Sequence, residues 1–240
     1  MELAGSQTKG VGFVNARTFT IARFGEEGWS KVLAALSAPD RAIVAGALPV
    51  GWYTSELHAR LLRAIERTHG KDDFALSVQI GRFSAEHDLK TIHRIFLRLF
   101  SPMVAVEKIG ELWPRYQTTG SWVVDGSSPT HLVGRLSKWG GNVDPILCLN
   151  IGGYVARCLE LAGAKDVVIE HARCGALGDA SCDFLARWGG DASPGPRTGG
   201  GWMLSPMPSG KLPRSPREGG APGRPPTVLA PAAVKRRSSM

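Results

Sequence analysis

Three cysteines and one histidine in a 35-residue window constrain this 240-residue chain more than any other feature. Cys148, His171, Cys174 and Cys182 all have side chains that bind soft divalent metal ions. Zinc takes Cys sulfur and His nitrogen in a tetrahedral shell, and a site whose four positions are filled by protein is closed and structural. The window therefore predicts a zinc site with three Cys ligands and one His ligand.

Local structure favours bringing these four side chains together. An apolar helix that begins at Asp144 contains Cys148 in its first turns, and a following hairpin places Cys174 opposite Cys182. His171 and Cys174 are an odd number of residues apart, so an unbroken strand would point them to opposite faces. The chain must therefore bend in the two residues between them.

Two other interpretations of the cysteines stay open. Free Cys is among the most buried residue types, so Cys148, Cys158, Cys174 and Cys182, which are all the cysteines present, could be ordinary core residues. Pairing into disulfides is the other alternative.

The same segments resemble a known family. The run His171-x2-Cys174-Gly-Ala-Leu-Gly-Asp-Ala-Ser-Cys182-Asp-Phe, preceded by Cys148-x4-Gly-Tyr, resembles the C-terminal half of the 4-vinyl reductase-type domain. The resemblance implies a small-molecule or hydrocarbon sensor, related to haem NO-binding domains and to a vesicle-tethering subunit fold. In aromatic-sensing members three cysteines and one acid hold zinc beside the effector pocket. It therefore implies Cys148, Cys174 and Cys182 as ligands, and leaves the fourth open between His171, where the family has Glu, and Glu170.

A second resemblance extends toward the N-terminus. Leu97-Arg-Leu-Phe-Ser-Pro and Tyr116-Gln-Thr-Thr-Gly-Ser-Trp122 are similar to an uncharacterised family that is expanded in myxobacteria. The haem NO-binding relatives use a Tyr-x-Ser-x-Arg signature, and the segment that begins at Tyr116 departs from it. We therefore expect no haem.

Catalysis finds little support in the sequence. Glu86-His87-Asp88 and His93 form the only acidic and His cluster, and their spacing does not place both histidines on one helical face. No nucleophile elbow, P-loop, zinc-protease or dinucleotide-binding motif is present. The reductase activity in the family name lacks a visible cofactor site, so we expect that the chain is not an enzyme.

The net charge of +8 is concentrated at the C-terminal end. Residues 189–240 contain eight basic and two acidic side chains and ten of the 16 prolines. Such a composition does not bury enough apolar surface to offset its ordering entropy, so we expect a disordered, basic tail that could dock weakly to an acidic partner. Residues 1–188 are nearly neutral and lack a basic stripe, which argues against specific nucleic-acid binding by the folded part.

The remaining pattern predicts an α+β domain over residues 9–188, after a flexible N-terminus at residues 1–8. Helical spacing of apolar residues predicts a run of N-terminal helices packed on a small four-stranded antiparallel sheet. The expected helices cover residues 14–24, 26–36, 54–68, 74–82, 88–100, 102–112 and 144–162. The expected strands cover residues 121–125, 131–136, 167–169 and 182–188.

Aromatic side chains at the junction of helices and sheet suggest a ligand pocket. Trp113, Tyr116 and Trp122 are expected to line an apolar pocket for a small apolar or aromatic effector, although such residues fill cores more often than pockets. The sequence thus predicts a non-enzymatic small-molecule sensor with a structural zinc site. The alternative is a dimerising scaffold protein with a filled core, and a homodimer is expected in either case. No run of 18 apolar residues and no secretory signal is visible, which predicts a cytoplasmic protein.

Overall fold

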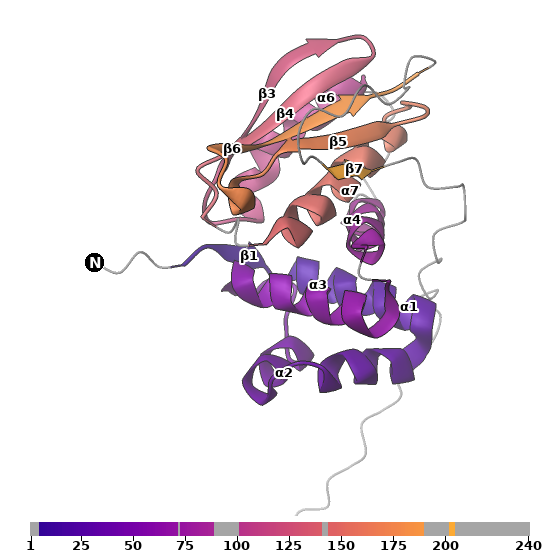
Figure 1. Ribbon diagram of the computed structural model, residues 1–240, viewed down its shortest axis with the longest axis vertical. Helices are drawn as coiled ribbons and strands as arrows, with labels where there is room; N and C mark the ends of the chain where they lie inside the picture. The colour runs from indigo at the N-terminus through magenta and orange to yellow at the C-terminus, as the bar shows by residue number, and fades with distance from the viewer. Residues whose placement is uncertain (1–4, 72, 89–100, 141–143, 190–201, 205–240) are drawn as a thin grey trace, which may run out of the picture.

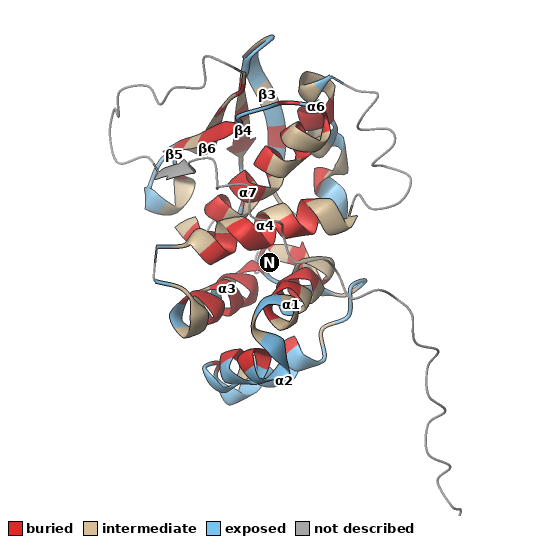
Figure 2. Cartoon of the chain, turned by 90° about the vertical axis from the view of Figure 1, so that its right-hand side faces the viewer, coloured by how far each residue is buried: buried red, intermediate tan, exposed pale blue. Residues whose placement is uncertain are grey.

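Helices form one end of the molecule and an antiparallel sheet forms the other (Figure 1). The computed structural model describes residues 5–71, 73–88, 101–140, 144–189 and 202–204. The two long N-terminal helices lie at the end opposite the sheet, and a pair of central helices separates them from it (Figures 1 and 2). The expected α+β class is confirmed.

The N-terminal layer contains three helices. Helix α1 (Val11–Ala34) is kinked at Gly25, whose φ of 75° is a conformation that glycine adopts without a steric penalty. Helix α2 (Ala38–Ala45) is short and largely exposed, and α3 (Ser55–His69) is capped by the Thr54 hydroxyl, which accepts from the Leu57 N–H. The kink agrees with the two helices expected around Gly25.

Some elements of this layer were not predicted. Helix α2 was missed because its eight residues are too few to show a clear period. Two three-residue strands, β1 (Gln7–Lys9) and β2 (Trp52–Thr54), were also missed, and they pair antiparallel in a small sheet of their own. The strand β1 brings the start of the chain against the beginning of α3.

The central helices α4 (Ala75–Asp88) and α7 (Pro145–Leu161) cross at unusually close range. A Cβ built on Gly153 of α7 would overlap the Val78 carbonyl of α4, and a Cβ on Gly81 of α4 would overlap the Asn150 carbonyl of α7. Glycine at these two positions therefore lets the helix backbones touch. This contact fixes the position of α7, whose buried residues reach both the helical layer and the sheet (Figure 2).

The sheet has the strand order β3-β4-β6-β5-β7, and every neighbouring pair is antiparallel. Its strands are β3 (Ser121–Ser128), β4 (His131–Ser137), β5 (Val168–Arg173), β6 (Ser181–Arg187) and β7 (Trp202–Leu204). Helix α6 (Pro102–Leu112) and the 3-10 turn Trp113–Arg115 lead into β3, and a second 3-10 turn, Gly175–Leu177, joins β5 to β6. The sheet has five strands where four were expected.

The fifth strand comes from the segment that the sequence assigned to a disordered tail. The β7 backbone pairs with β5 between Ile169 and His171. The rest of that tail, residues 190–201 and 205–240, lies outside the described residues. Most of the helix expected at 88–100 also lies outside them, since α4 ends at Asp88.

One hydrophobic core runs through the molecule from α1 to β6. Among the described residues, no helix has both the length and the apolar character that a membrane span requires.

Candidate functional site

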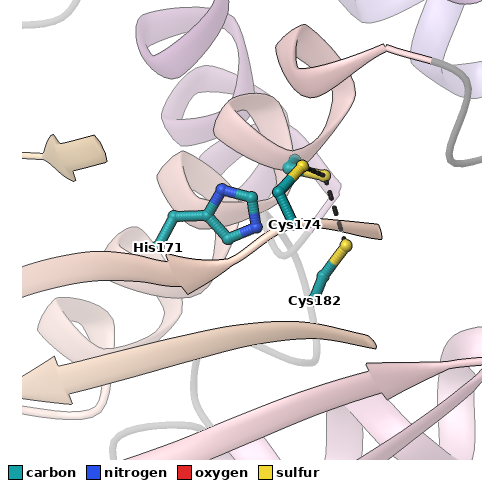
Figure 3. A group of neighbouring side chains, drawn as sticks. His171, Cys174 and Cys182 are labelled. Atoms are coloured by element: carbon teal, nitrogen blue, oxygen red, sulfur yellow. Dashed lines mark hydrogen bonds between the residues drawn. The ribbon is translucent and has the colours of Figure 1, made fainter. Parts of the chain in front are cut away.

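The four residues of the predicted metal site meet at one buried point, which we call the thiol cluster: Cys148, His171, Cys174 and Cys182. One ligand atom from each of the four lies within 4.8 Å of the others. The Cys148 Sγ is 3.5 Å from the Cys182 Sγ and 3.9 Å from the Cys174 Sγ. Figure 3 shows the His171 ring and the sulfur atoms of Cys174 and Cys182 directed toward a common space.

The elements explain how the cluster forms. Cys148 is in the first turns of α7, His171 is on β5, Cys174 directly follows β5, and Cys182 is on β6. The register of β5 and β6 shifts between His171 and Arg173, so a β-bulge lies where the sequence required a bend. The bulge places His171 and Cys174 on the same side of the hairpin.

His171 is buried, and no described residue hydrogen-bonds its ring. The residue is 1% exposed, and within the described part of the chain neither Nδ1 nor Nε2 has a partner. The ring stacks on Phe184 at 4.8 Å between centroids. Burial lowers the pKa of His171, which favours a neutral imidazole with a free lone pair.

The three thiols differ in pKa. Hydrogen bonds from Cys148 and Cys182 lower the pKa of the Cys174 thiol. The hydrogen bond between Cys148 and Cys174 raises the pKa of the Cys148 thiol. Backbone N–H groups also contribute, since Gly175 N donates to the Cys182 Sγ at 3.4 Å. Thiolate sulfur and neutral imidazole are the donor set of a tetrahedral soft-metal site.

The structure removes the disulfide alternative and separates two residues from the cluster. All four cysteines are free, so none of them is in a disulfide. Glu170 is not in the cluster and lies 4.0 Å from Arg187, because neighbouring strand residues point to opposite faces. Cys158 is a core thiol, packed with the alanines Ala85, Ala105 and Ala162.

A separate cavity of about 130 Å³ lies between the helices, and we call it the helical cavity. Its walls come from β1, α1, α3, α4, α6, the Trp113–Arg115 turn and α7. The apolar lining comprises Val11, Ile109, Leu112, Trp113, Ile151 and Val155. Such a mostly apolar wall with a few polar groups is typical of small-molecule sites.

Two of the three residues predicted to line a pocket are at this cavity. Trp113 and Tyr116 are in its wall. Trp122 is not: its ring lies 5.6 Å from that of Phe184 and covers Gly134 on the inner face of the sheet. The pocket therefore lies among the helices and not between the helices and the sheet.

The polar residues of the cavity were missed by the sequence analysis. His58 is on the cavity wall, stacks at 4.9 Å on Phe13, and has an Nε2 without a hydrogen-bond partner. Burial lowers the pKa of His58 to about 4. Asp88 accepts from Asn15 Nδ2 at 2.9 Å, and burial raises the pKa of its carboxyl to about 6.

One signal in the sequence could have found His58. It lies on the same helical face as Leu61, Leu62 and Ile65, so it is a polar side chain on an apolar stripe. Asp88 gave no such signal, because its neighbours Glu86 and His87 suggested a solvated face.

Comparisons with known proteins identify the fold. No family model and no curated protein matches the chain. An Fe(II) unliganded H-NOX protein from K. algicida matches with a TM-score of 0.57 at 12% identity, covering 76% of this chain and 97% of that one. An H-NOX protein from S. oneidensis in the Fe(II)NO state matches with a TM-score of 0.57 at 16% identity, covering 75% and 99%. An oxygen-binding H-NOX domain related to soluble guanylate cyclases matches with a TM-score of 0.54 at 10% identity, covering 79% and 100%. At these identities the matches show a shared fold.

These matches correct two expectations from the sequence. The assignment to the 4-vinyl reductase-type domain and to the myxobacterial family is wrong, because no family model matches and the similar structures are H-NOX proteins. The cofactor expectation of zinc without haem is also wrong, because two of these similar structures are of Fe(II) states of H-NOX proteins.

The helical cavity meets one requirement of a haem and fails another. Haem iron is held by His, Cys, Met or Tyr side chains, and the buried neutral His58 with its free Nε2 is such a donor. The described residues leave a space of about 130 Å³ there, which is close to the roughly 150 Å³ that holds one benzene ring and too small for a porphyrin macrocycle. The arrangement of these residues therefore supplies a donor atom but not the room for a macrocycle.

Proposed function

We propose that this chain is a non-enzymatic sensor module, which binds a small apolar molecule in the helical cavity. The observation that carries the proposal is the helical cavity itself, a partly open space of about 130 Å³ whose walls are mainly apolar. The H-NOX structures with this fold support it, since one is of an Fe(II)NO state and another is of an oxygen complex. Residues 9–188 are proposed as the sensor module.

We propose further that the thiol cluster binds a soft divalent metal ion, with Cys148, His171, Cys174 and Cys182 as ligands. Four donor atoms within 4.8 Å and a buried imidazole with two unpartnered nitrogens support this role. A buried polar group without a partner is costly, and a metal ion would satisfy it. The metal would anchor the start of α7 to the hairpin of β5 and β6.

Helix α7 connects the two sites. Cys148 belongs to the thiol cluster, while Ile151, Tyr154 and Val155, one to two turns later, are in the cavity wall. A ligand in the cavity therefore presses on a helix whose first turn is held by the cluster. This shared helix is the element through which binding would reach the sheet.

The scaffold alternative requires a filled core, and the helical cavity argues against that requirement. A homodimer remains a separate prediction, which light scattering of the purified chain would test. Because the chain has an H-NOX-like fold, haem and gases belong among the ligands to be tested.

A ligand screen on metal-loaded protein tests the sensor proposal. Small hydrocarbons, alcohols and aromatics, together with NO, CO and haemin, are added while the unfolding temperature and the visible absorption spectrum are recorded. A ligand that binds only the folded state adds about 2.7 kcal/mol at one hundred times its Kd. We expect at least one compound to stabilise the protein in a concentration-dependent way, and a wholly negative screen would contradict the proposal.

A matched pair of variants locates the site. Ile151→Phe places extra volume in the cavity wall and is expected to abolish the stabilisation. Val50→Phe adds a larger side chain at a position that is 74% exposed, and it should leave binding unchanged.

A further inference from the structure

No described residue is a hydrogen-bond partner of the His58 Nε2, although the residue is only 6% exposed. Buried polar atoms in native proteins are nearly always hydrogen-bonded, and an exception points to an absent partner. The rest of the ring is accounted for by its stacking on Phe13 at 4.9 Å. The unpartnered nitrogen is therefore the unexplained part of the cavity wall.

Gly12 packs directly against the His58 ring. A Cβ at Gly12 would lie 3.3 Å from the His58 Cε1, 3.5 Å from Nε2 and 3.8 Å from the Thr8 Cγ2. Gly12 belongs to the cavity wall, as do Thr8 and Asn15. The ring of His58 is therefore held in the same wall by close contact with α1, and an added side chain at Gly12 would displace it.

The imidazole is suited to a neutral polar group. Asn15 and Asp88 are hydrogen-bonded to each other at 2.9 Å, so that pair is already satisfied. The Lys9 ammonium lies 4.3 Å from the centre of the Trp52 ring. A neutral imidazole nitrogen accepts or donates one hydrogen bond according to its tautomer, and a hydroxyl group can serve either case.

We propose that His58 determines ligand specificity, by hydrogen-bonding the one polar group of an otherwise apolar ligand through Nε2. The ligand class is a small alcohol whose apolar body is no larger than about one ring, because a cavity of about 150 Å³ holds benzene. This inference rests on the proposed function and deepens it. The close contact with Gly12 holds the ring in the cavity wall, where the polar group of the ligand would meet it.

Two probes of matched shape test the proposal. Cyclopentanol carries a hydroxyl where methylcyclopentane carries a methyl group, and both are titrated into the full chain by calorimetry. In His58→Phe, which keeps a ring of similar shape but has no nitrogen, cyclopentanol should bind about 10-fold more weakly. The affinity for methylcyclopentane should stay within about two-fold, because it makes no hydrogen bond.

A second variant and a second measurement keep the test independent of whether His58→Phe folds. Gly12→Ala should weaken cyclopentanol selectively, whereas Gly46→Ala, whose Cβ would meet only the Ala42 carbonyl at 3.5 Å, should not. In the wild-type protein, cyclopentanol should shift the 15N NMR signal of the His58 Nε2, and methylcyclopentane should leave it in place.

The outcomes separate this proposal from the sensor proposal. Equal loss or no loss of affinity for both probes in His58→Phe, with an unmoved Nε2 signal, would overturn the role of His58 while leaving the cavity as a binding site. If neither probe binds the wild-type chain, the ligand class is wrong, and a hit with any other compound still supports a sensor.

Discussion

Two buried histidines define two different sites in this molecule. His171 and His58 are 1% and 6% exposed, and both have ring nitrogens without a hydrogen-bond partner. His171 shares its surroundings with three sulfur atoms within 4.8 Å, whereas His58 borders a cavity of about 130 Å³ with largely apolar walls. We propose an ion as the partner of the first ring and a small molecule as the partner of the second. The neighbours of a buried polar group, and not the group itself, indicate its partner.

The largest expected effect concerns the metal half of this comparison. Cys174→Ala should lose the metal ion and up to about 10 kcal/mol of unfolding free energy, because closed metal sites couple binding to folding on this scale. Since whole domains are stable by about 5–15 kcal/mol, the variant is expected to be largely unfolded. Metal content by mass spectrometry and denaturant unfolding, with and without a chelator, measure both effects.

Cys158→Ala is the matched control. Cys158 is as buried as Cys174, at 3% exposure, but lies in the separate core cluster with three alanines. It should cost only about 1 kcal/mol and keep the metal. Purified wild-type protein without stoichiometric metal would reduce the thiol cluster to ordinary core cysteines and end the comparison with His58.

A smaller effect is expected where the central helices touch. Gly153→Ala should force α7 away from the Val78 carbonyl of α4 and cost up to about 3 kcal/mol. Because α7 carries part of the cavity wall, ligand stabilisation should fall, while the metal content is retained. Urea unfolding with and without ligand measures this, and unchanged binding would show that the two sites do not depend on α7 in the way we propose.

The effect of His58 on the pH dependence of the unfolding free energy should be smaller again. Its pKa is about 4 in the folded protein and 6.5 in the unfolded chain, so the unfolded chain binds more protons between these values. The contribution of His58 to stability is full above pH 6.5 and is lost as the pH falls toward 4. By pH 5 the loss amounts to about 2 kcal/mol. The stability gap between His58→Phe and the wild type, measured in urea at pH 7 and pH 5, should change by this amount in favour of the variant.

Asp88 should change the unfolding free energy with pH in the opposite direction to His58, and by the smallest amount. Burial raises the pKa of its carboxyl to about 6 from 3.8, so the folded protein binds more protons between these values. Stability therefore rises as the pH falls from 7 to 5, by about 1 kcal/mol. Asp88→Asn should remove that rise relative to the wild type in the same urea experiment. A common sign for His58 and Asp88 would show that one of the two is not buried in the way that the cavity requires.

The part of the fold that could be predicted from the sequence is the part encoded locally. Apolar spacing and turn residues predict helices α1, α3, α4, α6 and α7 and strands β3 to β6, and strand alternation predicts the bend after His171. The α+β class follows from the order of these elements. Short segments such as α2, β1 and β2 were missed because three to eight residues do not establish a period.

The thiol cluster and the helical cavity differ in how far the sequence could reach. The residues of the thiol cluster could be predicted because Cys174 and Cys182 face each other across one hairpin, and the positions of such residues follow from local strand and turn geometry. The cavity is bounded by segments as distant along the chain as Gly12, His58 and Tyr154, and it exists because their side chains do not fill the space between them. Packing at that range depends on how α4 and α7 cross. Gly81 and Gly153 allow the two helices to touch, but a glycine in a helical sequence does not by itself predict such a crossing. For the same reason Trp122 faces the sheet while Trp113 faces the cavity, since the direction of each ring is fixed by the neighbours it meets after folding.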